Sequence, residues 1–360
     1  MRVAFISRAT IFTAPGGDTR QMEMTATYLR TMGVEVDILL SSDAVDYNAY
    51  DLLHFFNITR PTDIMHHVSR AKKPFLLSTI FVEHNRINEE KKGLAFQLVS
   101  QLFSPDGLSY LKIIARALLN GEKIMSKRYL LKGHRRSIRW IVKRAACLLP
   151  NSESEMRRFK QRYDIDAPYR VVPNGIDPGL VDKKFEPIPE YKNAIICLAR
   201  FEPLKNQIAL IRALNNTFYD VYLHGKPAPN HKAYYEECKD TAAVNVFIKD
   251  FLQGDDLYRV YASSKVHVLP SYFETTGLSS LEAAFMGCNI VVTDKGDTRD
   301  YFGDDAWYCD PDNDDSIREA VDAAYNAPYN PAFRERILKN FTWQRAAEET
   351  LAAYKQVLKV

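Results

Sequence analysis

Short apolar runs and longer amphipathic segments alternate along the first part of the chain. Continuous apolar runs are typical of buried parallel strands, and apolar residues three or four positions apart are typical of helices. Strands are therefore expected at residues 3–7, 36–40, 52–57 and 75–80, and helices at residues 19–32 and 61–71. Strands that alternate with helices predict a parallel sheet covered by helices.

The middle of the chain continues this pattern after a long, basic, helix-favouring region that ends near residue 144. Strands are expected at residues 147–149 and 169–172, with a helix at residues 153–162 between them. Ser152 and Glu155 have the spacing of a capping box, which predicts where that helix begins.

The second half starts the alternation again. Residues 178–189 carry three prolines and little periodicity, so they are interpreted as a linker. Strands are then expected at residues 194–199, 221–224, 244–248 and 266–269, and helices at residues 207–214, 233–240 and 255–263. Two such stretches separated by a linker predict two α/β domains.

Composition agrees with two domains and excludes several classes of protein. The chain has 360 residues, 46% of them hydrophobic, which is enough for large cores. No apolar segment approaches the roughly 20 residues of a membrane span and no secretory signal is recognised, so a cytoplasmic protein is expected. Five scattered cysteines without a C-x-x-C pair argue against disulfides and against a thiolate metal site. We expect them to be buried.

Charge is nearly balanced, at +3, but a basic excess lies between residues 112 and 144. Leu131, Trp140 and other apolar residues are interleaved with these lysines and arginines. One interpretation is a peripheral contact with an anionic membrane surface. The other is a solvated helix face whose apolar side lies in the core, and the sequence leaves both open. A nucleic-acid partner is not expected, because no base-reading motif accompanies the cations.

The most informative segment is residues 270–287, which follows the apolar run at 266–269. Gly277 allows a sharp entry into a helix expected at residues 278–286. Glu274 is then placed in the loop at the end of the strand, and Glu282 about one turn inside the helix. Backbone N–H groups at a helix start attract anions such as a diphosphate.

Two cations are expected near the same edge of the second sheet. Arg200 follows the first strand of the second domain, and Lys205 comes five residues later, just before a helix. Open α/β sheets bind ligands at the carboxyl ends of their strands. Two fixed cations there can stabilise negative charge on a departing phosphate.

This combination resembles the donor-binding signature of the family-4 retaining glycosyltransferases, whose usual form is an E-G-F-G-L stretch followed by L-E-A. The chain matches the signature at Glu274, Gly277, Leu278, Leu281, Glu282, Ala283 and Gly287, and departs from its common residues at Thr275, Thr276, Ser279 and Asn289. The resemblance is strong over residues 170–311 and weak over residues 87–144.

The resemblance implies an α/β fold of the GT-B type, with two Rossmann-like doubly wound parallel-sheet domains facing across a cleft. Residues 1–178 would form the acceptor-binding domain, and residues 190–342 the domain that binds a nucleotide-sugar donor. A helix within residues 343–360 would pack back on the first domain.

The resemblance also implies roles for single residues. Arg200 and Lys205 would hold the diphosphate of the donor, with UDP or GDP as the expected nucleotide. Glu282 would accept hydrogen bonds from the ribose, and Glu274 would lie beside the transferred sugar. Thr276, Gly277 and Leu278 would complete the donor site.

The implied reaction keeps the anomeric configuration, and the leaving phosphate helps to deprotonate the acceptor on the same face. This route needs no protein nucleophile. We expect neither a cofactor nor a catalytic metal, because the D-x-D string at residues 312–314 is interpreted as the start of a helix.

Further candidates lie in the first domain. Gly16 and Gly17 precede a helix, where they would let a phosphate or the acceptor approach the backbone, although a plain turn needs no such role. Many family members carry a histidine after the fourth strand, but this chain has Ser78-Thr79-Ile80-Phe81 there. Glu83 and His84 are the nearest polar groups and are candidates to line the cleft.

These expectations combine into one function. The chain is expected to be a retaining, metal-independent glycosyltransferase that moves a sugar to a glycan or lipid-linked acceptor in cell-surface polysaccharide synthesis, at the inner face of the cell membrane. Alternatives are a GT-B epimerase or phosphorylase, and a non-catalytic scaffold that binds sugar nucleotides.

Overall fold

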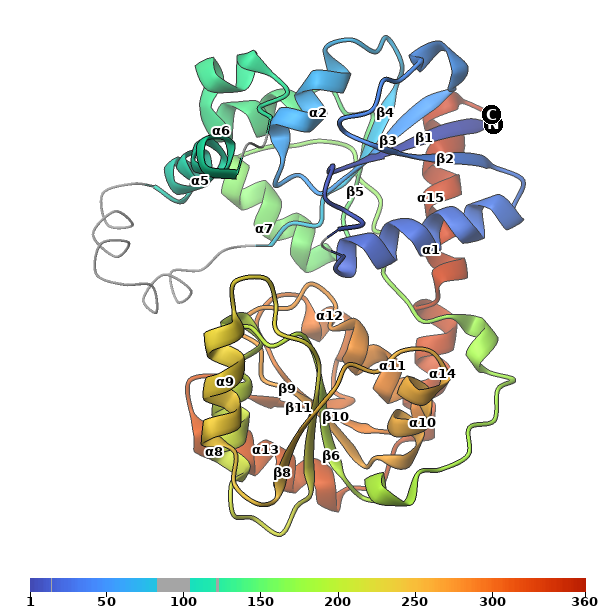
Figure 1. The fold of residues 1–360 in the computed structure, drawn as a ribbon. Helices are drawn as coiled ribbons and strands as arrows, with labels where there is room; N and C mark the ends of the chain where they lie inside the picture. The colour runs from blue at the N-terminus through green and yellow to red at the C-terminus, as the bar shows by residue number, and fades with distance from the viewer. Residues whose placement is uncertain (14, 83–103, 121–122) are drawn as a thin grey trace. The chain divides into compact units, whose positions relative to one another are not determined.

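The computed structural model describes residues 1–13, 15–82, 104–120 and 123–360. It divides into two compact units, Met1–Asn174 with Trp343–Val360, and Gly175–Thr342. Each unit contains one parallel sheet (Figure 1). The cleft between two facing domains stays a prediction.

The first unit ends at Asn174 rather than at residue 178. The backbone explains this boundary, because the N–H of Ile176 donates to the carbonyl of Phe341 at 2.9 Å. Gly175 lies so close to Thr342 that an added Cβ would come within 2.4 Å of its backbone. The segment that the sequence suggested as a linker belongs to the second unit and holds short 3-10 helices at Pro178–Leu180 and Pro189–Tyr191.

The sheet of the first unit has the order β2-β1-β3-β4-β5, and its neighbours are parallel. Its strands are β1 (Arg2–Ser7), β2 (Glu35–Leu40), β3 (Leu52–Phe56), β4 (Phe75–Ser78) and β5 (Cys147–Leu149). Every residue of β3, β4 and β5 is buried. This burial is the reason that these strands are recognisable as continuous apolar runs.

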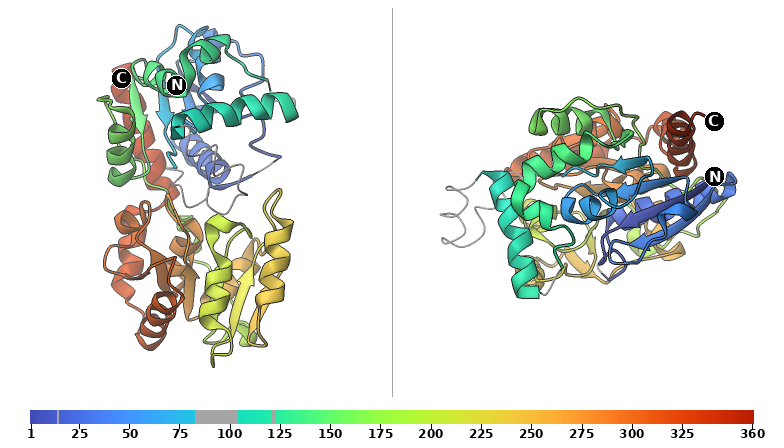
Figure 2. Two further views of the ribbon diagram at one scale, coloured as in Figure 1. Left: turned by 90° about the vertical axis from the view of Figure 1, so that its left-hand side faces the viewer. Right: turned by 90° about the horizontal axis from the view of Figure 1, so that it is seen from above.

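Helices cover this sheet and include the last helix of the chain. They are α1 (Gly17–Thr31), α2 (Pro61–Val68), α5 (Pro105–Asn120), α6 (Lys127–Val142), α7 (Glu153–Tyr163) and α15 (Trp343–Leu358). Helix α15 packs beside α1, and α2 packs beside α6 (Figure 1). Both ends of the chain therefore belong to the first unit, and they lie near each other in both views of Figure 2.

Polar contacts hold α15 in this place. The hydroxyl of Tyr354 lies 2.6 Å from Nδ1 of His54 in β3, and Arg170 forms an ion pair with Glu349 at 2.5 Å. His54 is completely buried, and burial lowers its pKa to about 3. The imidazole is therefore neutral and serves as a structural link.

One local expectation for this unit is corrected, and one of its helices contains a break. Residues 169–172 do not form a strand, because Tyr169 makes only an isolated bridge to Leu148. Their backbone runs beside β5, but β5 is only three residues long. Helix α6 contains a break at Gly133, whose φ of 72° lies outside the helical region.

The sheet of the second unit has the order β11-β10-β9-β6-β7-β8 and is also parallel. Its strands are β6 (Ile195–Leu198), β7 (Val221–His224), β8 (Val246–Lys249), β9 (Val266–Leu269), β10 (Asn289–Thr293) and β11 (Ala306–Cys309). Its α-helices are α8 (Gln207–Leu214), α9 (Lys232–Thr241), α10 (Asp255–Ser263), α11 (Leu278–Met286), α12 (Thr298–Phe302), α13 (Asp314–Asn326) and α14 (Pro331–Asn340).

The cysteines are buried, as the sequence predicted. All five cysteines are buried and unpaired by disulfides. Burial raises the pKa of the Cys197 thiol to about 12, so this thiol stays protonated at neutral pH. Within the described ranges, we find no helix with the length and apolar character of a membrane span.

Candidate functional site

Three loops meet at the carboxyl edge of the second sheet, after the neighbouring strands β6, β9 and β10. The N–H of Tyr272 donates to the carbonyl of Leu204 at 2.9 Å, which joins the loops after β9 and β6. The N–H of Asp297 donates to the carbonyl of Glu274 at 2.8 Å, which joins the loops after β10 and β9. Backbone hydrogen bonds alone therefore hold these three loops together.

Lys205 and Glu274 are brought together by this arrangement. Nζ of Lys205 donates to Oε1 of Glu274 at 2.5 Å. Their side chains are 18% and 8% exposed. A largely buried charge is stable only when it is paired, so each residue holds the other in place.

Gly296 supports Glu274 and is a residue that the sequence analysis missed. It has a φ of +92°, and an added Cβ would lie 2.0 Å from the carbonyl oxygen of Glu274. Glu274 and Gly296 also form a parallel bridge. The signal in the sequence is a single glycine among the charged residues that follow the apolar run at β10, and alone it is too common to identify a site.

Arg200 lies at the same edge but has a different partner. Its side chain is 48% exposed and pairs with Glu202 on its own loop at 3.3 Å. The carbonyl of Arg200 accepts from Nε2 of Gln207 at 2.8 Å, which ties the loop to the start of α8. Gly225 packs against this loop, since an added Cβ would lie 2.0 Å from the carbonyl oxygen of Ala199. Contact of Arg200 with a diphosphate stays a prediction.

Helix α11 begins at this edge as predicted. Gly277 precedes it with a φ of 72°, in the left-handed region that favours glycine. Gly277 has no side chain that could cap the start of α11, and the first turn of this helix carries no acidic residue. Thr276 is buried, Leu278 is the first helical residue, and Glu282 is half-buried one turn further along. A helix start whose first turn carries no carboxylate is suited to an anion.

In the first unit, Gly16 and Gly17 lie at the start of α1. The N–H of Gly16 donates to Oγ1 of Thr19 at 3.0 Å, and Thr19 donates to the carbonyl of Ile11 at 3.1 Å. A Cβ added at Gly17 would meet nothing within 4 Å. The fold itself therefore does not require glycine at residue 17.

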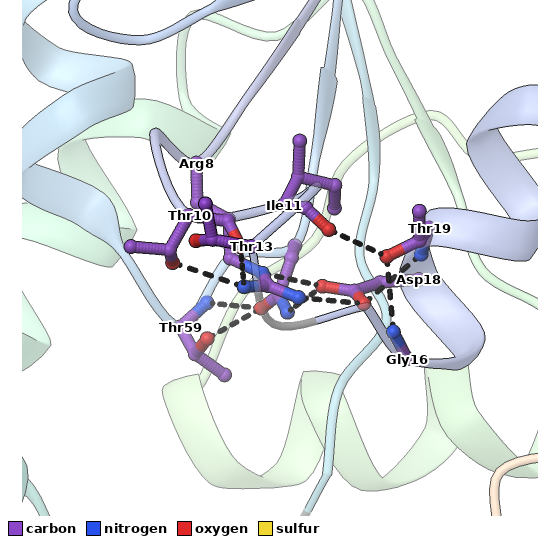
Figure 3. A network of polar contacts seen from close by, with 9 residues as sticks. Arg8, Thr10, Ile11, Thr13, Gly16, Asp18, Thr19 and Thr59 are labelled. Atoms are coloured by element: carbon purple, nitrogen blue, oxygen red, sulfur yellow. Dashed lines mark hydrogen bonds and ion pairs between the residues drawn. The ribbon is translucent and has the colours of Figure 1, made fainter.

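An ion pair lies beside these glycines. The guanidinium of Arg8 donates to both carboxylate oxygens of Asp18, at 2.9 and 3.1 Å (Figure 3). Burial raises the pKa of Asp18, but the hydrogen bond and the charge of Arg8 outweigh it, so the pKa is lowered overall. The Asp18 carboxylate therefore stays ionised at neutral pH.

The buried carboxylate of Glu155 holds the loop after β4. From the sequence, Glu155 was expected only to cap the start of α7. Glu155 accepts hydrogen bonds from Thr79 Oγ1 and from the N–H groups of Phe81 and Asn151. Burial raises the pKa of Glu155, although these bonds lower it in part. Ile80 has a φ of +44°, an unusual conformation for a β-branched residue. Glu83 and His84 lie outside the described residues.

The acidic D-x-D string starts α13, as predicted. Asn313 caps the helix by accepting from the N–H groups of Asp315 and Ser316, and Asp314 pairs with Arg212 at 2.7 Å. Among the residues that the structure describes, no three His, Cys, Asp or Glu side chains converge as metal ligands. The expectation of a metal-independent reaction stays a prediction.

Comparison with known proteins gives two family matches that together cover most of the chain. Residues 181–341 match the family described as glycosyl transferases group 1. Residues 15–180 match the family described as glycosyltransferase family 4. The first match contains Arg200, Lys205, Glu274 and Glu282, and the second contains Gly16 and Gly17.

Curated relatives align with parts of the chain. A D-inositol 3-phosphate glycosyltransferase of Nocardioides is 25% identical, over 60% of this chain and 55% of its own. An O-antigen chain mannosyltransferase B of Escherichia coli is 28% identical, over 29% of each chain. The chain thus spans about half or less of the length of the curated relatives it matches.

Solved structures align over the whole chain. The sucrose-phosphate synthase of Thermosynechococcus elongatus has a TM-score of 0.73 at 15% identity, and covers 100% of this chain and 99% of its own. HepE of Anabaena, solved with UDP and glucose, has a TM-score of 0.66 at 14% identity, and covers 99% and 100%. The fold is therefore the two-domain GT-B fold, and the chain belongs to the group 1 and family 4 glycosyltransferases.

Proposed function

We propose that this glycosyltransferase moves a sugar, with retention of its configuration, from a UDP- or GDP-sugar to a glycan or lipid-linked acceptor of a cell-surface polysaccharide. The observation that carries the proposal is the ion pair of Lys205 and Glu274 near the start of α11, whose first turn carries no acidic residue. The O-antigen mannosyltransferase among the relatives supports the polysaccharide. The UDP in the HepE structure supports a nucleotide donor.

The chemistry follows from the charges at this edge. The helix start binds the donor diphosphate, and Lys205 turns from Glu274 toward the phosphate on which charge develops. Glu274 is then available to accept from sugar hydroxyls and to offset positive charge at the anomeric carbon. The reaction keeps configuration because the leaving phosphate accepts the acceptor's proton on the same face.

The donor can be identified by thermal shift with UDP, GDP, ADP and their sugars. A ligand at about 100 times its Kd stabilises the chain by about 2.7 kcal/mol. Release of nucleoside diphosphate is then measured with candidate acceptors. Lys205→Ala is expected to slow transfer by about 100-fold or more, because it removes a fixed cation from the leaving group.

Lys239→Ala is the matched control for this variant. Lys239 lies on α9 and forms an exposed pair with Glu236 at 3.4 Å, so its loss should leave transfer unchanged. Wild-type rates in folded Lys205→Ala would contradict the assignment.

The reaction products distinguish the alternative functions. Epimerised nucleotide sugar would indicate an epimerase, and cleavage of the substrate by inorganic phosphate would indicate a phosphorylase. Nucleotide binding without turnover would indicate a scaffold. The anomeric configuration of the product, read by NMR, tests retention.

We also propose that α6 docks this enzyme on the inner face of the membrane. Its apolar face, with Tyr129, Ile138 and Ile141, is buried in the unit, and Arg135 pairs with Asp106 at 3.6 Å. Leu131 is nevertheless 88% exposed. Lys127, Arg128 and Lys132 are exposed close to it in the sequence, and Arg136, Lys143 and Arg144 are exposed further along. Apolar contact combined with attraction to anionic lipid is what a peripheral surface needs.

Sedimentation with liposomes tests this second proposal. The wild type should pellet more with vesicles that contain anionic phosphatidylserine than with neutral ones. Leu131→Glu should reduce pelleting, whereas Val244→Glu, which replaces a 91% exposed valine of the second unit, should not. Equal pelleting with both vesicle types would remove the proposal.

A further inference from the structure

A small hollow with polar and apolar lining residues lies in the first unit, after the carboxyl ends of β1, β2 and β3 and beside the start of α2. Its polar lining consists of Ser7, Arg8, Ser41, Asn57, Arg60 and Asp63. None of these residues was singled out from the sequence. Carboxyl ends of parallel strands are the usual place for a ligand in an open α/β sheet.

The size of the hollow limits what it can hold. Its cavity volume is about 10 Å³. That is about the space that one water molecule needs. The hollow therefore fits one oxygen atom of a larger ligand, such as a sugar hydroxyl.

A buried hydroxyl in this lining has no hydrogen-bond partner among the described residues. Ser7 is 3% exposed, and its Oγ forms no hydrogen bond with any described residue. Buried polar atoms are nearly always hydrogen-bonded in folded proteins, to protein or to water. A water molecule or a ligand hydroxyl would supply the hydrogen bond that the described residues do not give to this Oγ.

The charges around the hollow are balanced. Arg8 is held by both oxygens of Asp18, and these side chains are 15% and 10% exposed. Asp63 accepts from Oγ of Ser41 at 2.9 Å, and Arg60 supplies the second cation of the lining. The two cations and two carboxylates therefore leave no net charge that would attract a phosphate, whereas a neutral hydroxyl can both donate and accept here.

We propose that this hollow binds one hydroxyl of a neutral sugar of the acceptor, through Oγ of Ser7, and that it selects such sugars over phosphorylated ones. The inference rests on the proposed function, because an acceptor glycan must present hydroxyls to the enzyme. It adds the class of acceptor sugar.

Saturation-transfer NMR on the full chain tests the inference. The neutral probes are methyl α-D-mannopyranoside and methyl α-D-glucopyranoside, and the charged probes are mannose 6-phosphate and glucose 6-phosphate. We expect a neutral probe to bind more tightly than either phosphate. Ser7→Ala should weaken that binding by about 3- to 10-fold, which corresponds to the loss of one hydrogen bond.

Ser137→Ala is the matched control. Ser137 is a fully buried serine of α6 whose Oγ also has no partner among the described residues, and it does not line the hollow. Neither substitution removes a hydrogen bond within the chain, so both variants should melt like the wild type. Only Ser7→Ala should change sugar binding.

Three results would overturn the inference: tighter binding of a sugar phosphate, unchanged affinity in Ser7→Ala, or no binding of either neutral probe, which would leave the hollow as the site of a structural water. Thermal shift with UDP and GDP on the same samples separates the two proposals. Nucleotide binding without glycoside binding rejects this inference alone, and the absence of nucleotide binding rejects the proposed function.

Discussion

Two glycines of the second unit share a positive φ but have different surroundings. Gly296 has a φ of +92°, and an added Cβ would lie 2.0 Å from the backbone of Glu274. Gly287 ends α11 with a φ of +106°, and an added Cβ would meet nothing within 4 Å. Substitution of Gly287 therefore tests only the cost of an unfavourable backbone conformation, whereas substitution of Gly296 also tests the displacement of Glu274.

Gly296→Ala is expected to lower transfer by at least 10-fold, because the loop after β10 must move away from Glu274. Gly287→Ala should cost about 1–2 kcal/mol of stability through its backbone conformation but leave kcat/KM unchanged. Urea unfolding and initial rates on both variants provide the comparison. Equal kinetic losses would show that Gly296 has no special link to Glu274.

Gly17→Ala tests the predicted role of the double glycine. Residue 17 is the first residue of α1 and has open space around it, so alanine should stabilise the chain by about 0.5–1 kcal/mol. If a ligand approaches the backbone here, KM for donor or acceptor should nevertheless rise. Higher stability with unchanged KM would assign Gly17 to a plain turn.

At the scale of elements, the local hydrophobic pattern of the sequence was enough to predict most strands and helices. Continuous apolar runs located β3, β6 and β9, and the ends of β6 and β9 predicted that Lys205 and Glu274 lie at one edge. The support from Gly296 was not predictable, because it depends on β10 pairing beside β9. Residues 169–172 have strand-like composition, but they extend beyond the short partner β5. The hollow at Ser7 combines residues from three strand ends and a helix, and no spacing in the sequence reveals it.

The start of α1 gives a prediction for acid pH. The pKa of Asp18 is lower in the folded chain than its ordinary value of 3.8. Its contribution to stability is therefore complete above about pH 4 and is lost as the pH falls through the folded pKa. The difference in unfolding free energy between the wild type and Asp18→Asn should be constant from pH 7 to 5 and shrink below pH 4. A difference that is constant to pH 2.5 would contradict the role of Arg8.

At the scale of the whole molecule, buried histidines occur in both units. Burial lowers the pKa of His54 to about 3 and that of His134 to about 4 in the first unit, and that of His267 to about 3 in the second. Their ordinary pKa is 6.5. The unfolded chain therefore binds more protons than the folded chain once the pH falls below that value.

Stability is accordingly expected to be full above pH 6.5 and to decrease as the pH falls from 6.5 toward 4. Urea unfolding at intervals between pH 7.5 and 4.5 measures this slope. A free energy of unfolding that is flat over this range would mean that these imidazoles are protonated in the folded state.

The hydrogen bond between Ile176 and Phe341 closes the second unit at its two ends. Residues 175–342 are thus a continuous segment that begins and ends at one point, like an insert in a host that consists of residues 1–174 and 343–360. Such a segment can be cut out without breaking either sheet. Expressed alone, residues 175–342 should fold and retain affinity for the nucleotide. The donor-binding unit and the other unit could then be expressed from separate genes and engineered independently.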